Sequence, residues 1–162
     1  MTHPPQSDQC FTIGHGNYPI DRFIDILRHI GIDIIIDVRS TPYSRFNPQF
    51  NRENLEKSLK ERAIGYLFMG DRLGGRYTEP GLLFPDGTVN YRKVQETEQF
   101  RKGIGRLLEL ITGDKLVALM CAEKDPELCH RSLLIAPALN KTGVRVVHVR
   151  ADGTLQEHMT LE

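Results

Sequence analysis

Short apolar runs alternate along the chain with segments in which apolar residues recur every three or four positions. Residues 10–13 form the first run, and residues 32–38 form a second that is nearly continuous in β-branched side chains. Such runs are typical of strands buried on both faces of a sheet. Between them, Pro19 opens and Gly31 ends a segment with helical spacing. Strand, helix and strand in succession form the βαβ unit from which parallel sheets are built.

The same alternation continues to the end of the chain. It predicts strands over residues 64–70, 115–121 and 144–149, helices over residues 52–62 and 91–111, and a loop or short hairpin over residues 77–90. Gly103 and Gly105 indicate a kink or close packing in the second helix. Asp125 and Pro126 suit the start of a last helix, which Pro137 should kink or divide. We therefore expect an α/β single-domain three-layer fold with a mainly parallel central sheet of about five strands.

Length and composition agree with a globular domain. The 162 residues are 40% hydrophobic and 26% charged, and we expect a disordered N-terminal tail over residues 1–9 followed by one domain over residues 10–162. No apolar run approaches the roughly 20 residues of a membrane-spanning helix, and the N-terminus lacks the apolar core of a signal peptide. Three cysteines without a dense framework favour a reducing, cytoplasmic environment.

The distribution of charge is uneven although its sum is zero. A net charge of zero argues against a strongly basic nucleic-acid-binding protein. Residues 38–76, however, contain eight Lys or Arg against four Asp or Glu, a local charge of +4. Several of these arginines fall in predicted loops, so their positions are not explained as the solvent-exposed face of a helix. The segment is therefore a candidate site for an anion.

Polar clusters follow the end of each of the first four predicted strands. In an open parallel sheet these carboxyl ends meet at one edge, which is where ligands bind. The candidate catalytic residues are His15, Cys121, Glu123 and His130. The candidate ligand-binding residues are Asp37, Arg39, Ser44, Arg72, Gly74, Gly75, Arg76 and Arg131. No nucleotide-binding glycine fingerprint accompanies them.

The segment 120–132, "MCAEKDPELCHRS", permits several interpretations. A metal site would use Cys121, Glu123, Cys129 and His130, but the C-x7-C-H spacing has no second ligand pair, and neighbouring Cys129 and His130 on a helix would point about 100° apart. A nucleophilic Cys121 would sit at a strand end, yet the acidic loop after it should raise its thiol pKa. The structural alternative is that Cys129 packs in the core as a small hydrophobic side chain.

An anion pocket and a structural network are the other two interpretations of the arginines. Arginine presents a planar fork that suits phosphate or carboxylate, which favours Arg39, Arg72, Arg76 and Arg131 as ligand-binding groups. Alternatively, Asp37, Glu123 and the arginines satisfy one another in salt bridges. Aromatic residues interleave with Arg45 and Arg52, a pattern compatible with a nucleobase or single-stranded nucleic acid; they are Tyr43, Phe46, Phe50, Tyr66 and Tyr77.

The blocks "TIGHGN", "DVRSTPYSRFNPQFN", "LGGR", "LMCAEKDPELCHRSLL" and "VVHV", within residues 11–149, resemble those of domain-of-unknown-function family 488. The family has no established activity, and the resemblance implies a compact α/β fold. This chain has Gly16 where the family usually has serine. The polar positions that the resemblance implies are His15, Asp37, Arg39, Pro42, Ser44, Gly74, Gly75, Cys121, Glu123, Cys129, His130 and Arg131.

These observations lead to two main hypotheses. The first is a hydrolase or transferase acting on a phosphorylated, nucleotide or nucleic-acid substrate, with His15 or His130 as general acid or base and Asp37 or Glu123 orienting a histidine. The second is a non-catalytic module that binds an anionic small molecule or nucleic acid. A thiol enzyme based on Cys121 and a Cys/His metal site are further alternatives. No cofactor, membrane partner or oligomeric state is indicated.

Overall fold

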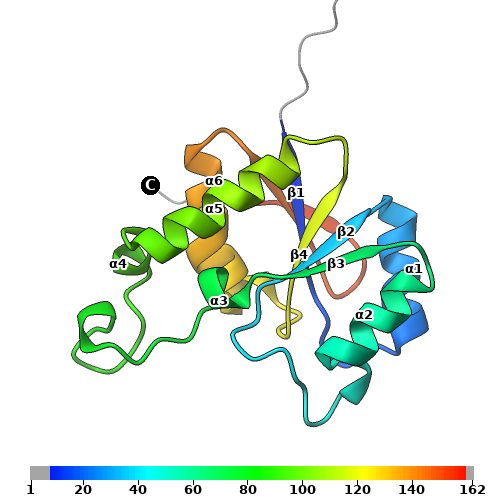
Figure 1. Cartoon of the computed structure of the whole chain (residues 1–162), viewed down its shortest axis with the longest axis horizontal. Coiled ribbons are helices and arrows are strands. Elements are labelled where there is room, and N and C mark those ends of the chain that lie inside the picture. The colour runs from blue at the N-terminus through cyan, green and yellow to red at the C-terminus, as the bar shows by residue number, and fades with distance from the viewer. Residues whose placement is uncertain (1–7, 160–162) are drawn as a thin grey trace, which may run out of the picture.

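The computed structural model describes residues 8–159 and contains one six-stranded sheet in the order β3-β2-β4-β1-β5-β6 (Figure 1). The strands are β1 (Gln9–Gly14), β2 (Ile34–Asp37), β3 (Gly65–Phe68), β4 (Val117–Cys121), β5 (Arg145–Val149) and β6 (Leu155–Glu157). The first five pair in parallel and β6 is antiparallel to β5, which confirms the predicted α/β class with a mainly parallel sheet. Residues 1–7 of the predicted tail lie outside the described residues.

Helices cover both faces of the sheet, so the predicted three layers are confirmed (Figure 1). On one face lie α1 (Ile20–Ile30) and α2 (Arg52–Lys60); on the other lie α3 (Gly70–Leu73), α4 (Tyr91–Gln95), α5 (Glu98–Ile111) and α6 (Ala136–Lys141). Alternate residues of a strand point to opposite faces. Ile35 accordingly packs with Phe23 of α1, whereas Ile36 packs with Phe100 and Leu107 of α5.

The predicted helix over residues 91–111 is divided into α4 and α5, a break between residues 95 and 98 that the sequence did not predict. Asn90 caps α4 by accepting from the backbone N–H of Lys93, and Thr97 caps α5 by accepting from that of Phe100. The two caps separate the helices, while Gly103 lies inside an unbroken α5. A Cβ on Gly103 would lie 2.8 Å from Leu73 Cδ2. Close packing, and not a kink, accounts for this glycine.

Residues 122–141 form short helical pieces where one divided helix was predicted. A 3-10 turn (Pro126–Leu128) capped by Asp125 is followed by a π-helical turn (Arg131–Ile135) and then by α6, with Pro137 in its first turn. Between the first two pieces Cys129 is extended, with φ −125° and ψ 147°. The helical geometry that would separate the Cys129 and His130 side chains therefore does not apply. Further 3-10 turns cover Pro48–Phe50 and Pro80–Leu82.

Within residues 8–159 no helix combines the length and apolar character needed to cross a membrane. The short strand β6 was not predicted. All three of its residues are exposed, and it follows β5 through a turn in which the N–H of Arg150 donates to the carbonyl of Thr154. A strand that buries no side chain leaves no apolar alternation to detect.

Candidate functional site

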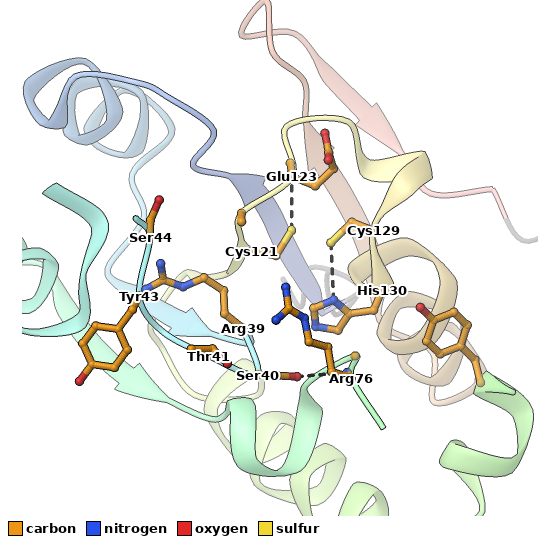
Figure 2. Close-up of a pocket in the computed structure, with 13 residues that line it drawn as sticks. Arg39, Ser40, Thr41, Tyr43, Ser44, Arg76, Cys121, Glu123, Cys129 and His130 are labelled. Atoms are coloured by element: carbon orange, nitrogen blue, oxygen red, sulfur yellow. Dashed lines mark hydrogen bonds between the residues drawn. The ribbon is translucent and has the colours of Figure 1, made fainter. Parts of the chain in front are cut away.

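A pocket of about 360 Å³ opens at the carboxyl ends of the neighbouring strands β2 and β4 (Figure 2). Seven of the twelve predicted site residues line it: Arg39, Ser44, Gly75, Arg76, Cys121, Glu123 and His130. The other five, His15, Asp37, Arg72, Gly74 and Arg131, do not. The lining is completed by Ser40, Thr41, Tyr43, Tyr91, Ala122 and Cys129. Three of these additional residues belong to the loop that begins at Arg39, whereas nothing in the local sequence marked Tyr91.

Asp37 at the end of β2 holds Arg39 in a buried, two-pronged ion pair. The Nε–H and Nη2–H groups of Arg39 donate to the two carboxylate oxygens over 2.9 and 2.7 Å, and the Arg39 backbone N–H donates over 3.1 Å. Tyr66 also donates its hydroxyl to Asp37, over 2.6 Å. Asp37 is inaccessible and Arg39 is 5% exposed. For these two residues the predicted structural salt bridge is present, so Arg39 brings little unpaired positive charge to the pocket.

His15 supports Arg39 from behind and does not line the pocket. Its ring stacks on Phe50 with centroids 4.4 Å apart, and Nδ1 lies 2.8 Å from the carbonyl oxygen of Gly16. The proton therefore sits on Nδ1, and Nε2 accepts from Arg39 Nη1 over 3.3 Å. Burial lowers the pKa of His15 to about 4, although the hydrogen bond to Gly16 acts in the opposite direction and raises it. The expectation that His15 acts as general acid or base needs correction, because it is a neutral, buried support.

Arg131 lies beneath the two pocket cysteines and is fully buried. Its Nε–H group points at both sulfur atoms, 2.9 Å from Cys121 and 3.4 Å from Cys129. Nη1 donates to Thr12 Oγ1 over 2.8 Å and Nη2 to the carbonyl oxygen of Glu123 over 2.7 Å. The expectation that Arg131 faces a ligand is therefore corrected. Its guanidinium is engaged on all sides and acts on the pocket through the sulfur atoms.

His130 is oriented so that one ring nitrogen faces Cys129 (Figure 2). Nε2 lies 2.8 Å from the carbonyl oxygen of Val38, which can only accept, so Nε2 carries a proton. Nδ1 lies 3.6 Å from the sulfur of Cys129. The Arg131 backbone N–H donates to the same sulfur over 3.5 Å. A nucleophile, a histidine and a group that orients the histidine are thus in contact, which is the arrangement of an activated thiol.

The two thiols have opposite pKa shifts. A hydrogen bond from Cys121, together with His130 and Arg131, lowers the pKa of Cys129 to about 3 although burial opposes this. Burial raises the pKa of Cys121 well above its ordinary value, and the hydrogen bond to Cys129 adds to this effect. These opposite directions favour a thiolate on Cys129, whose sulfur contacts His130 and the backbone N–H of Arg131, whereas the Arg131 Nε–H lies closer to Cys121. Cys129 packs in the core, as one interpretation of the sequence expected, and its sulfur also contacts His130 and Arg131, so Cys129 joins Cys121 as a candidate nucleophile.

The other predicted polar side chains each lie in a different setting. Glu123 is exposed, and its contact with Arg131 is made through its backbone oxygen, so its carboxylate does not join the predicted salt bridges. Arg76 is exposed on the pocket wall, where its backbone N–H donates to Ser40 Oγ. Arg72 is exposed outside the pocket. Ser44 uses its hydroxyl locally, as acceptor for the backbone N–H of Asn47 over 3.1 Å.

No three His, Cys, Asp or Glu side chains converge on a common point in the described part of the chain in a way that could hold a metal ion. Cys121, Cys129 and His130 are close together, but the Nε–H group of Arg131 lies against both sulfur atoms. A guanidinium in that position supplies the positive charge that a cation would otherwise bring to the thiolate.

Replacing Gly75 by alanine should disturb the Cys129–His130 contact. A Cβ at Gly75 would lie 2.7 Å from Cγ of His130, so the ring has to move, whereas a Cβ at Gly81 meets nothing within 4 Å. We expect Gly75→Ala to destabilise the protein by about 1–3 kcal/mol, typical of overpacking, and to slow alkylation of Cys129 severalfold. Urea denaturation and mass-mapped alkylation measure both effects, with Gly81→Ala as the control. An unchanged alkylation rate would contradict the assigned role of His130.

Acidification should destabilise the fold through its buried histidines. Burial lowers the pKa of His15 and of His148 from 6.5 to about 4. The unfolded chain therefore takes up protons first as the pH falls, and stability present above about pH 6.5 is lost towards pH 4. Between about pH 7 and 5 each histidine should account for about 2 kcal/mol, and the lowered pKa of Cys129 adds a loss in the same direction because the unfolded thiol is protonated in this range. Urea denaturation at the two pH values tests this, with exposed His29→Gln as control; a stability independent of pH would refute it.

The geometry defines a class: an α/β protein with a polar pocket at the carboxyl ends of its parallel strands, containing a thiol–imidazole contact supported by a buried arginine. Residues 19–137 match the family model described as Domain of unknown function DUF488, and the chain belongs to this family. This confirms the resemblance found in the sequence. No curated protein and no solved structure matches the chain.

Proposed function

We propose that this protein is a thiol-dependent hydrolase or transferase whose pocket binds a phosphate-bearing ligand, such as a nucleotide or the end of a nucleic acid, and whose nucleophile is Cys129. The observation that carries the proposal is the position of the Cys129 sulfur, in contact with His130 and Arg131 at the wall of a pocket that also contains Arg76. Of the two candidate general acids or bases, His130 contacts the thiol of Cys129, whereas His15 contacts Arg39 and Phe50.

Arg76 is the group best placed to attract an anion. Its side chain is exposed to the pocket, and no ion pair joins its guanidinium to any residue between 8 and 159. Arg39, by contrast, is already neutralised by Asp37. The hydroxyl-bearing residues Ser40 and Thr41 line the same wall. A guanidinium beside hydroxyl and backbone donors suits a phosphate.

The loop that follows β2 supplies features that suit a base. Tyr43 lines the pocket and is 54% exposed, and Phe46 is 84% exposed with the guanidinium of Arg45 5.6 Å from its ring centre. Exposed aromatic rings beside arginines are the usual platform on which nucleobases stack. The loop is held in place from below, because Phe50 is buried and the Arg52 N–H donates to the carbonyl of Pro42. These features favour a nucleotide over inorganic phosphate.

The chemistry would proceed in two steps at Cys129. Its thiolate attacks the phosphorus or carbonyl carbon of the substrate, the bond to the leaving oxygen breaks, and protonated His130 gives its Nδ1 proton to that oxygen. Water, or a second acceptor in a transferase, then attacks the thiol-linked intermediate and His130 receives a proton. A cytoplasmic location belongs to the same proposal, since a reducing compartment keeps all three cysteines as the free thiols they are.

Ligand binding and turnover can be tested separately. Inorganic phosphate and adenosine monophosphate should raise the melting temperature of the wild type, since a ligand at about 100 times its Kd stabilises by about 2.7 kcal/mol. The shift should disappear in Arg76→Ala and persist in Arg101→Ala, a control with an exposed arginine on α5. Absence of any shift with either anion would overturn the phosphate part of the proposal.

Turnover is tested with 4-nitrophenyl phosphate, a phosphodiester analogue and a short oligonucleotide. Hydrolysis should be lost in Cys129→Ser and retained in Cys10→Ala, because Cys10 is buried in β1 away from the pocket. Activity that survives in Cys129→Ser would exclude Cys129 as nucleophile. Anion binding without turnover of any of these would favour the second hypothesis, a non-catalytic binding module.

A further inference from the structure

We propose that Cys121 and Cys129 form a catalytic dithiol pair that reduces small hydroperoxides, with Cys129 as the sulfur that attacks the peroxide and Cys121 as the sulfur that resolves the product. The proposal shares the Cys129 nucleophile with the proposed function but needs neither the phosphate-bearing ligand nor Arg76. It adds a role for Cys121, a residue that hydrolysis or group transfer leaves without one.

The two sulfur atoms are held together by one guanidinium. The Nε–H group of Arg131 lies 2.9 Å from the sulfur of Cys121 and 3.4 Å from that of Cys129. Both cysteines line the pocket and both are free thiols (Figure 2). Cys121 comes at the end of β4 and Cys129 follows after seven intervening residues, in a loop whose one helical element is a 3-10 turn. Disulfide formation brings the two Cβ atoms to about 3.5–4.5 Å, so the loop between the cysteines has to accommodate that separation.

The protonation of the pair suits an oxidation in two steps. Redox-active cysteines combine thiolate character, access and a neighbouring resolving thiol. Cys129 has the thiolate character, since hydrogen bonding from Cys121 and contact with His130 and Arg131 lower its pKa to about 3. Cys121 keeps its proton until the first step has removed the charge next to it. A hydroperoxide is small enough to enter a pocket of about 360 Å³.

The reaction balances with a peroxide as oxidant and a low-molecular-weight thiol as reductant. In the first step the Cys129 thiolate attacks one peroxide oxygen, the O–O bond breaks, and His130 protonates the alkoxide or hydroxide that leaves; Cys129 becomes a sulfenic acid. In the second step the Cys121 thiol attacks the sulfenic sulfur, an S–S bond forms and water leaves. Two molecules of the external thiol then reduce the disulfide through a mixed disulfide.

Arg131 should make the disulfide easy to reduce. In the dithiol form its buried charge is balanced by the Cys129 thiolate, whereas the disulfide leaves the fully buried guanidinium without a negative partner. A buried charge without a partner is costly, so the reduced form is favoured. Disulfides with such a bias are labile and catalytic, in contrast to those that only stabilise a fold. Cys10, fully buried in β1 with a pKa raised by burial to about 12, has none of these features.

Treatment of the full-length protein with one equivalent of hydrogen peroxide, followed by intact-mass and peptide analysis, tests the proposal. The wild type and Cys10→Ala should form the Cys121–Cys129 disulfide and consume peroxide repeatedly when dithiothreitol is present. Cys121→Ser should stop at a Cys129 sulfenic acid that dimedone traps, and should lose repeated turnover. Cys129→Ser should show neither product. Circular dichroism establishes whether each variant is folded. If Cys121→Ser is unfolded, Cys121→Ala replaces it.

Two results would overturn the proposal. One is a wild-type protein in which peroxide produces no Cys121–Cys129 disulfide; the other is a Cys121→Ser protein that turns over peroxide as fast as the wild type. If iodoacetamide modifies Cys129 rapidly while peroxide forms no disulfide, the dithiol chemistry fails and the proposed function stands. If Cys129 reacts with neither reagent, both fail.

Discussion

Replacing Arg131 by methionine is expected to lower the free energy of unfolding by about 3–5 kcal/mol, the cost typical of removing one partner from a buried charged contact. The guanidinium is fully buried and holds two sulfur atoms, the hydroxyl of Thr12 and the carbonyl of Glu123. Methionine fills much of the same volume but donates no hydrogen bond. The groups around it would then be buried without partners, at a cost of about 1–3 kcal/mol for each unsatisfied group.

Urea denaturation measures this effect, and the melting temperature should fall by roughly 2–4 °C for each kcal/mol in a protein of this size. The matched control is Arg101→Met, which changes an exposed arginine on α5. The same variant should also raise the pKa of Cys129, because Arg131 is one of the groups that lower it. A loss of less than about 1 kcal/mol would mean that Arg131 does not hold the two halves of the site together.

Replacing Asp37 by asparagine should have an effect of similar size. The substitution keeps the shape of the side chain but removes the negative charge that faces Arg39. Arg39 is 5% exposed, and within residues 8–159 its ion pair is with Asp37. We expect a loss of about 3–5 kcal/mol, because Arg39 is left as a buried charge without a partner. An asparagine amide has one accepting oxygen, and its NH2 group can only donate. It therefore cannot replace both carboxylate oxygens as acceptors for Tyr66 and Arg39.

Denaturation of Asp37→Asn beside Asp25→Asn, an exposed aspartate of α1, makes the comparison. Because Arg39 lines the pocket, the folded Asp37→Asn variant should also bind phosphate less tightly than the folded wild type. If Asp37→Asn is as stable as Asp25→Asn, the ion pair contributes nothing to the fold. The role of Asp37 as the residue that positions Arg39 would then be withdrawn.

The fold was largely predictable because its strands are buried. The first three residues of β2 and all of β4 are apolar, and their alternate side chains enter the two cores, which leaves a strong pattern in the sequence. β6 has no buried residue and therefore no apolar pattern in the sequence. The break between α4 and α5 depends on the cap at Thr97, a short local signal within a longer helical periodicity that points the other way.

The location of the site was predictable and the roles within it were not. Parallel strands bring their carboxyl ends together, so Arg39, Cys121 and Glu123 could be assigned to one edge from the sequence. The roles depend on contacts between distant segments. His130 is oriented by Val38, and Arg131 reaches Thr12 on β1, separations of 92 and 119 residues along the chain. Nor does any local pattern predict that Cys129 is extended between a 3-10 turn and a π-helical turn.

The central claim is that Cys129 is a thiolate at neutral pH, and the pH dependence of its alkylation tests this most directly. Native protein is treated with iodoacetamide at a series of pH values, and the rate at each cysteine is obtained by peptide mass analysis. With a pKa of about 3, Cys129 should react first and at a rate that stays constant between about pH 5 and 8. A rate that rises about tenfold per pH unit over this range, or reaction at Cys121 before Cys129, would contradict the account.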